Sequence, residues 1–101
     1  MRMMMIVGLP HQTFNAAVKD GTVGSKMKAI FEAVKPESVY FTEMNGRRTA
    51  VLLVEVEKPS TVPALAEPWF LNFDADVELH VVMSPEELEE AGLDKLGLRW
   101  R

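Results

Sequence analysis

The sequence predicts a single α+β domain in which helices cover one face of a four-stranded antiparallel sheet. Three observations predict it. Segments of strand length alternate with segments of helical spacing along the chain. The dipeptide Asn45-Gly46 separates two strand-like segments, as in a tight hairpin. The 101 residues suit one domain, and no linker or repeat divides residues 1–101.

The first extended segment is Met3 to Val7, a continuous apolar run that is followed by Gly8 and Pro10. Such a run is typical of a strand buried on both faces. It is far shorter than the ~20 apolar residues of a membrane-spanning helix. It also lacks the charged, apolar and small-residue regions of a signal peptide. We therefore expect a strand here and no membrane partner.

The segment from Thr13 to Lys35 has helical spacing. Apolar or small residues recur three or four positions apart at Phe14, Ala17, Gly21, Gly24, Met27, Phe31 and Val34. Two interpretations remain open, because glycines both break helices and let them pack closely. Either one long helix spans the segment, or two helices meet near Gly21. Pro36 ends the helix in both cases.

The strands Ser38 to Met44 and Thr49 to Glu57 flank Asn45-Gly46, which readily adopts the positive φ angles of a hairpin turn. Alternation along both strands separates two faces. One face carries Val39, Phe41, Ala50, Leu52 and Val54, and the other carries Tyr40, Thr42, Thr49, Val51, Leu53 and Glu55.

A short helix is predicted over Ser60 to Ala66, and we expect Pro68 to kink or stop it. Val77 to Met83 alternates as the fourth strand, so Glu78, His80 and Val82 share one face. Ser84-Pro85-Glu86-Glu87 then has the pattern of a capping box with proline at the first helical position. A last helix is therefore expected, with Gly92 at its C-terminal cap.

The resulting order, β-α-β-β-α-β followed by a C-terminal helix, matches the ferredoxin-like plan. Its sheet has one face that no helix covers. That face would carry Tyr40, Val51, Leu53 and Val82, with Glu78 and His80 among them. Because so apolar a face is unfavourable in water, we predict a homodimer in which two sheets pack face to face. The alternative is a monomer whose own C-terminal helix and tail cover the face.

The element order and the apolar open face resemble the dimeric α/β-barrel superfamily of the ferredoxin-like fold. The stretches Ala64–Phe70, Asp76-Val77-Glu78 and Ser84–Leu88 look like those of small bacterial proteins of unassigned function. The resemblance implies a ligand cavity between sheet and helices. That superfamily includes monooxygenases, muconolactone-isomerase-like enzymes and proteins of unknown role, so the resemblance does not by itself imply an activity.

Composition excludes several classes of function. Eleven Lys and Arg against 15 Asp and Glu give a net charge of −4, which disfavours nucleic acid and anionic membranes as partners. The absence of cysteine removes disulfides, thiolate catalysis and thiolate metal sites, and it fits a reducing cytoplasm. No motif predicts a cofactor. Gly21 to Lys26 lacks the spacing of a phosphate-binding loop.

His80, Glu78 and Tyr40 are the candidate catalytic residues, since a histidine beside a carboxylate can act as a general base. Trp69, Thr42 and His11 are candidate ligand-binding residues. Asp74 and Asp76 precede Glu78 and His80 at a spacing of two, and all four are metal-ligand types. Such residues lie ~6.7 Å apart on a strand and cannot converge on one ion unaided, so no metal site is predicted.

Three functions remain open. The chain could be a homodimeric domain with a small-molecule-binding or purely structural role and no catalysis. It could be a monooxygenase-like or isomerase-like enzyme acting on a hydrophobic molecule in a pocket of several hundred Å³, with His80 open to solvent. It could also be a protein-interaction adaptor that uses the acidic helix at Glu86, Glu87, Glu89 and Glu90.

Overall fold

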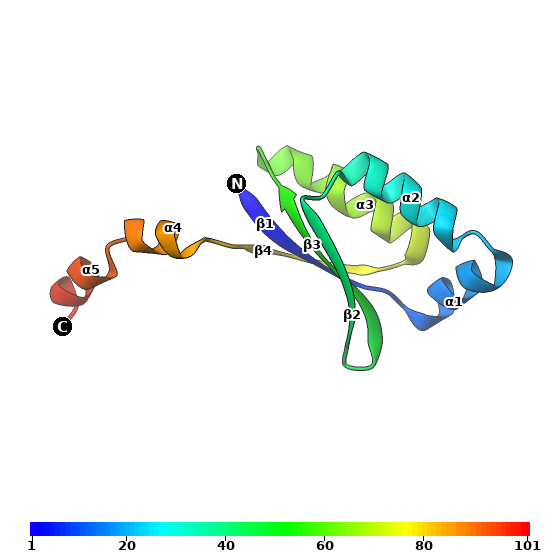
Figure 1. Cartoon of the computed structure of the whole chain (residues 1–101), viewed down its shortest axis with the longest axis horizontal. Helices are drawn as coiled ribbons and strands as arrows, with labels where there is room; N and C mark the ends of the chain where they lie inside the picture. Colours follow the sequence, from blue (N-terminus) through cyan, green and yellow to red (C-terminus); the bar gives the residue numbers. More distant parts are fainter.

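The computed structural model describes residues 1–101 as an α+β body with a C-terminal extension (Figure 1). The strands are β1 (Arg2–Gly8), β2 (Ser38–Met44), β3 (Arg47–Glu55) and β4 (Asp76–Val81). The helices are α1 (His11–Asp20), α2 (Val23–Val34), α3 (Val62–Phe73), α4 (Pro85–Glu90) and α5 (Leu93–Arg99), and a 3-10 turn η1 (Pro59–Thr61) precedes α3.

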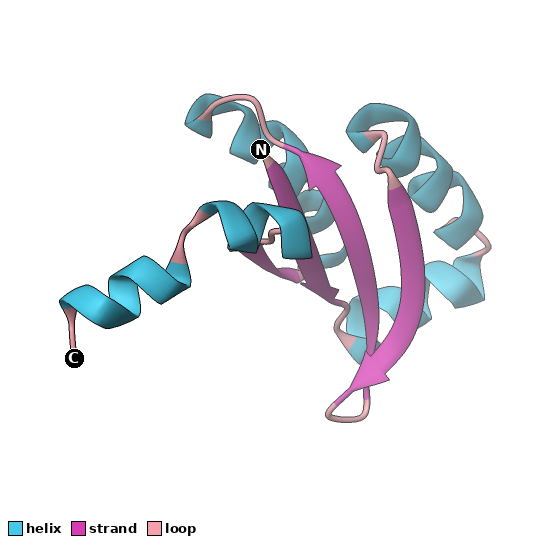
Figure 2. Cartoon of the chain, turned by 60° about the vertical axis from the view of Figure 1, so that its left-hand side comes forward, coloured by secondary structure: helices cyan, strands magenta, loops and turns pink.

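The four strands form one antiparallel sheet in the order β2-β3-β1-β4. This order is compatible with a ferredoxin-like arrangement. Strand β1 lies between β3 and β4, but the prediction that it is buried on both faces is wrong: Met5 and Val7 are fully buried, whereas Met4 and Ile6 on the alternate face are only half-buried. Helices α1, α2 and α3 all lie on one side of the sheet (Figure 2). The other side is called the open face below.

The segment between β1 and β2 forms two helices rather than one, which decides between the two interpretations left open by the sequence. Gly21 adopts a left-handed conformation with φ of 80° and ends α1. The Asp20 carboxylate then accepts hydrogen bonds from the Thr22 amide at 2.9 Å and the Thr22 hydroxyl at 2.6 Å. The glycine cap and the hydrogen bonds between Asp20 and Thr22 together change the direction of the chain between the two helices.

The hairpin between β2 and β3 confirms the predicted turn. Asn45 and Gly46 have φ angles of 56° and 76°, the two left-handed positions that a type I′ turn requires. The Glu43 carboxylate accepts a hydrogen bond from the Gly46 amide at 2.8 Å. Strand β2 has the predicted bounds, whereas β3 begins and ends two residues earlier than predicted.

The prediction of a short helix over Ser60 to Ala66 that stops near Pro68 is wrong, because α3 continues to Phe73. Pro68 has no amide hydrogen, so the Ala64 carbonyl loses its partner one turn earlier, at a cost of ~3 kcal/mol. Continuing the helix buries the Trp69 and Phe73 side chains completely. Burial of two large aromatic side chains stabilises by a similar or larger amount, so the helix persists.

The core fills the space between the sheet and helices α1 to α3. Fourteen buried residues form it, and partly buried residues such as Phe14 and Phe31 pack against them. The Trp69 ring lies 6.0 Å from the ring of Phe31 and 6.5 Å from that of Phe73, measured between centroids. Side chains therefore fill the centre of this layer, and a depression of about 460 Å³ opens at its edge beside Met3, Val56 and Val62.

The chain after β4 also differs from its prediction. Strand β4 ends at Val81 rather than Met83, and two short helices follow rather than one. The capping box is confirmed: Ser84 Oγ accepts from the Glu87 amide at 3.1 Å, and the Glu87 carboxylate accepts from the Ser84 amide at 2.9 Å. Gly92, with φ of 69°, follows α4 as expected, but it also begins α5.

Residues 82–101, called the C-terminal arm below, project away from the body (Figures 1 and 2). The chain measures 59 × 29 × 19 Å and its radius of gyration is 17.0 Å. A compact domain of this length has a radius of gyration of ~13 Å. The alternative in which the C-terminal segment covers the chain's own open face is therefore wrong. No helix is both long and apolar enough to cross a membrane.

Candidate functional site

The centre of the open face is apolar. Met4 and Ile6 of β1 lie beside Leu53 and Val51 of β3, respectively, and all four side chains are half-buried. Their side chains point away from the helices, since the alternate positions on the same strands belong to the core. Only neighbouring strands shield them, so this face combines an apolar centre with access to solvent.

Glu78 and His80 border this apolar centre on edge strand β4, where they pair with Ile6 and Met4. His80 Nε2 lies 3.0 Å from Glu78 Oε1, and both side chains are exposed to solvent. The contact agrees with the predicted sharing of one face at a spacing of two. A carboxylate that holds an imidazole in place can support general base catalysis.

Tyr40 shares the open face but lies on the opposite edge. The register across the sheet runs from Tyr40 through Val51 and Ile6 to Glu78. Three strand spacings of ~4.8 Å separate the two ends of this row by ~14 Å. One chain therefore does not bring Tyr40 into contact with Glu78 or His80. The tyrosine side chain is 69% exposed.

The other predicted site residues lie apart from this pair. Thr42 is exposed on β2, two residues closer to the hairpin than Tyr40 and on the same face. His11 begins α1, beyond the end of β1 that is opposite to the His80 end. Trp69 is fully buried, and its indole Nε1 has no hydrogen-bond partner. Its position is that of a core anchor rather than of a residue in contact with a ligand.

The alternating acidic residues before His80 do not form a metal site. Asp74 lies outside β4 and caps α3 in a left-handed conformation, with φ of 54°. Asp76 accepts a hydrogen bond from Arg47 Nη1 at 3.0 Å. No three His, Asp or Glu side chains are placed so that they could hold one metal ion.

The hairpin end of the open face is hollowed. The hollow has a volume of about 180 Å³ and lies beside the Arg47–Asp76 ion pair. Its lining is completed by Ile6, Gly8, Met44, Asn45, Thr49 and Glu78. The sequence did not reveal this hollow, because Arg47 and Asp76 come together only through the strand order. Arg48, the residue after Arg47, donates a hydrogen bond to Asn15 Oδ1 at 2.8 Å.

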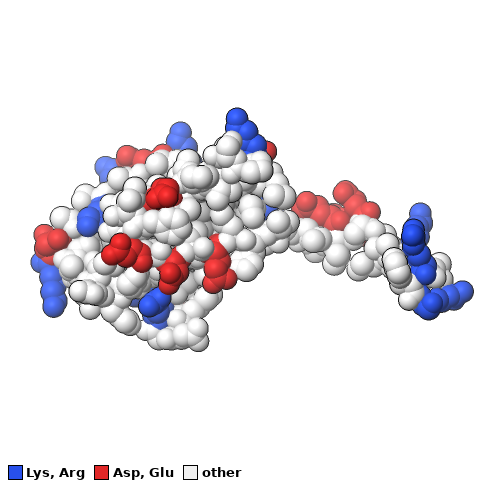
Figure 3. All heavy atoms as spheres, turned by 180° about the vertical axis from the view of Figure 1, so that it is seen from behind, with Lys and Arg blue, Asp and Glu red and all other residues white.

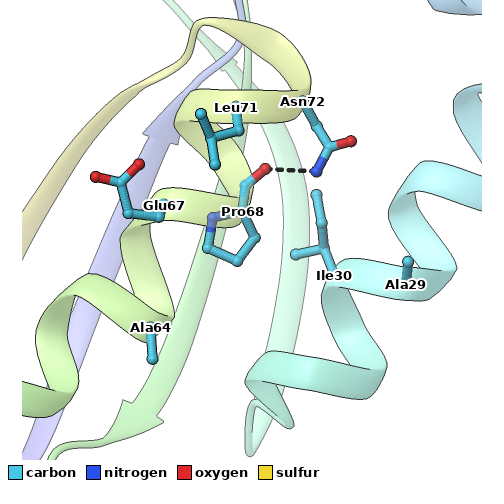
Figure 4. Close-up of a pocket in the computed structure, with 7 residues that line it drawn as sticks. All are labelled: Ala29, Ile30, Ala64, Glu67, Pro68, Leu71 and Asn72. Atoms are coloured by element: carbon cyan, nitrogen blue, oxygen red, sulfur yellow. Dashed lines mark hydrogen bonds between the residues drawn. The ribbon is translucent and has the colours of Figure 1, made fainter.

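A second depression, of about 440 Å³, lies between α2 and α3 (Figure 4). Its lining residues are Ala29, Ile30, Ala64, Glu67, Pro68, Leu71 and Asn72. In Figure 4 the Asn72 amide turns back onto α3, where it donates to the Pro68 carbonyl at 2.7 Å. The sequence feature that could have indicated this depression is Pro68. A proline within a helix has no amide hydrogen to donate to the carbonyl one turn earlier, here that of Ala64. Glu67 is the only ionisable residue of this depression.

No protein-family model matches the sequence, and a comparison with curated proteins found no match. The functional conclusion therefore depends on the geometry of the chain. Of the two surfaces, the open face brings together more of the predicted site residues. It combines an apolar centre, a hydrogen-bonded histidine and carboxylate, and a hollow lined by charged groups.

Proposed function

We propose that the protein acts as a homodimeric domain that binds a small hydrophobic molecule between two open faces. The observation that carries this proposal is the uncovered apolar centre formed by Met4, Ile6, Val51 and Leu53. An antiparallel sheet that stays in contact with water normally has polar side chains on its solvent face. Because this sheet is apolar on both faces, a second copy is a natural cover for it.

Face-to-face packing also explains the distribution of polar residues at the two edges. A two-fold axis parallel to the strands would set the β2 edge of one copy over the β4 edge of the other. Tyr40 of one copy would then lie opposite Glu78 and His80 of its partner. The three groups, which are separated within one chain, would border one ligand from both sides.

The depression between α2 and α3 supports ligand binding less well. The Asn72 amide is engaged by the Pro68 carbonyl, and the Leu71 side chain is 81% exposed at the rim. Small-molecule sites combine an enclosed apolar surface with a few converging polar groups. The open face supplies such polar groups, and pairing would enclose its apolar centre.

The proposal is tested by native mass spectrometry on gently purified protein and on Val51→Lys. The unmodified chain is expected to give a dimer that carries additional, removable mass. A lysine at position 51 would place a charge in the apolar centre, so the variant is expected to lose the contact between open faces and the bound ligand. Leu71→Lys, at an exposed position of α3, is the matched control. It should keep both the dimer and the additional mass. A monomeric unmodified chain would contradict the proposal.

The hydrogen bond between His80 and Glu78 favours a second candidate, an oxygenase-like or isomerase-like enzyme with His80 as general base. In this case the molecule that is released from the dimer should be converted to a product when it is incubated with ligand-free, unmodified protein. His80→Gln should stop conversion while the dimer and the bound mass are retained. Binding without conversion by the unmodified protein would leave the non-catalytic proposal.

A further inference from the structure

The C-terminal arm consists of two helices that are too short to be stable by themselves. Helix α4 has six residues and α5 has seven, and isolated helices shorter than ~12–15 residues are marginal in water. Their apolar side chains Leu88, Leu93, Leu96, Leu98 and Trp100 are all exposed. Neither helix contributes a buried residue. The arm therefore presents an apolar surface that its own body does not cover.

A groove of about 350 Å³ lies between α4 and α5. Its apolar lining comes from Pro85, Leu88 and Leu93, and its polar lining is acidic, from Glu89 and Asp94. A site of this composition suits an apolar group that is flanked by positive charges.

The tip of the same arm has the complementary chemistry. Trp100 is 77% exposed, and Arg99 and Arg101 flank it in the sequence. The Arg99 guanidinium carbon lies 5.5 Å from the centre of the Trp100 ring. Tryptophan and arginine are the side chains that most often dominate the energetics of protein interfaces. The tip formed by Arg99, Trp100 and Arg101, called the knob below, is thus basic and aromatic.

Charge is separated along the arm and mixed over the body (Figure 3). Four of the five acidic residues of the arm lie in α4, next to the body, and the fifth, Asp94, begins α5, whereas the basic residues gather toward the tip. An antiparallel pair of such arms would place acidic α4 of each copy against the basic tip of the other. The arm is therefore complementary to itself under a two-fold rotation.

Trp100 does not fill the groove of its own arm. It follows Leu93 by seven residues, which corresponds to ~10 Å along a helix, and its ring is exposed. The occupant must come from another molecule. We propose that two copies of this chain pair through antiparallel arms, with Trp100 of each copy in the α4–α5 groove of the other. Arg99 and Arg101 then lie against Glu89 and Asp94 of the partner.

This contact is independent of the open face, because it involves only residues of the C-terminal arm. Charge reversal in two separate variants tests it. One variant carries Glu89→Arg and Asp94→Arg, and the other carries Arg99→Glu and Arg101→Glu. In each variant the groove and the knob carry charges of the same sign, so two copies of that variant repel each other. In a mixed pair, however, both contacts join opposite charges again.

The two variants are mixed in equal amounts, one with a mass tag, and the dimers are counted by native mass spectrometry. Arm pairing predicts that the mixed dimer exceeds its statistical proportion. A statistical mixture would overturn arm pairing even if dimers form through the open face. The absence of any dimer in the unmodified chain would overturn it as well. The matched control replaces the first variant by Glu32→Arg with Glu57→Arg on the body, and it should give no such excess.

Tryptophan fluorescence provides an independent measurement. The chain has two tryptophans, and Trp69 is buried at any concentration, so a change on association must come from Trp100. Arm pairing predicts that emission shifts to shorter wavelength as the protein is concentrated. Trp100→Ala should abolish the shift and weaken self-association through the arm by roughly 30-fold. An unchanged emission spectrum over the concentration range of association would overturn the proposal.

Discussion

Asn72 donates a side-chain hydrogen bond to the carbonyl oxygen of Pro68 at 2.7 Å, one turn earlier in α3. This bond lies at the point where proline interrupts the backbone hydrogen bonds of the helix. It is an additional bond to the Pro68 carbonyl, and the Ala64 carbonyl remains without its usual donor. Tolerance of the proline within α3 therefore depends on the burial of Trp69 and Phe73.

Replacing Pro68 with alanine is therefore expected to stabilise the protein. The Ala64 carbonyl would regain a backbone donor, and alanine is the residue with the highest helix propensity. We expect the free energy of unfolding to rise by ~1–3 kcal/mol, measured by urea denaturation. Pro63→Ala is the control: Pro63 lies in the first turn, where a missing amide hydrogen costs little, so a much smaller change is expected.

Trp69→Ala is expected to be strongly destabilising. The side chain is fully buried and packs against Phe31 and Phe73, so truncation leaves a large cavity. We expect a loss of ~3–5 kcal/mol in thermal or chemical unfolding. Trp69→Phe keeps most of the volume and removes the unpaired indole nitrogen, so its cost should be clearly smaller. Similar costs for both variants would contradict the assignment of Trp69 to the packed core.

Gly46→Val tests the hairpin turn. Gly46 has φ of 76°, and a β-branched residue is strained at such an angle. The space around the glycine is open, so backbone conformation rather than a clash would cause the effect. A loss of ~1–2 kcal/mol is expected in urea denaturation. Asn45→Gly keeps the left-handed turn accessible and should change stability far less.

The N-terminal cap of α4 predicts a pH dependence of the arm. Hydrogen bonds from the Ser84 amide and hydroxyl lower the pKa of Glu87 below its ordinary value of 4.5. A carboxyl with a lowered pKa stabilises the structure above its unfolded pKa, and this contribution is lost as the pH falls through the folded pKa. We therefore expect the helicity of α4 to decrease below about pH 4.5. Residue-specific NMR shifts in α4 would follow this loss.

Ser84→Ala provides the comparison for this titration. Without the Ser84 hydroxyl, the pKa of Glu87 should move upward toward its ordinary value. A side-chain NMR titration of Glu87 measures the change directly. Because the Ser84 amide remains in the variant, an unchanged pKa would show that the Ser84 hydroxyl does not contribute to holding the carboxylate.

The sequence predicts best where the structure depends on local chemistry. The Asn45-Gly46 turn and the Ser84 to Glu87 capping box were both found from residues that lie next to each other. Pro68 is the opposite case, since its helix continues through burial of Trp69 against distant parts of the chain. Helix α5 was missed because it is short and Gly97 interrupts its pattern.

The same distinction applies to the candidate site. Glu78 and His80 are two apart on one strand, so alternation was sufficient to place them together. Tyr40 was correctly assigned to the same face, but only the strand order shows that three strand spacings separate it from Glu78. The Arg47–Asp76 ion pair likewise required the order of the strands, which alternation does not provide.

The position of β1 also bears on the order in which the molecule folds. The hairpin of β2 and β3 joins neighbours in the chain, and such hairpins form within ~1–10 μs. By contrast, β1 receives one partner from the middle of the chain and the other from β4, where Met3 pairs with Val81. Closing so large a loop lowers the conformational entropy of the chain before the contacts between these strands can stabilise it. We expect the interior strand, although first to be synthesised, to be the last to have both its neighbours in place.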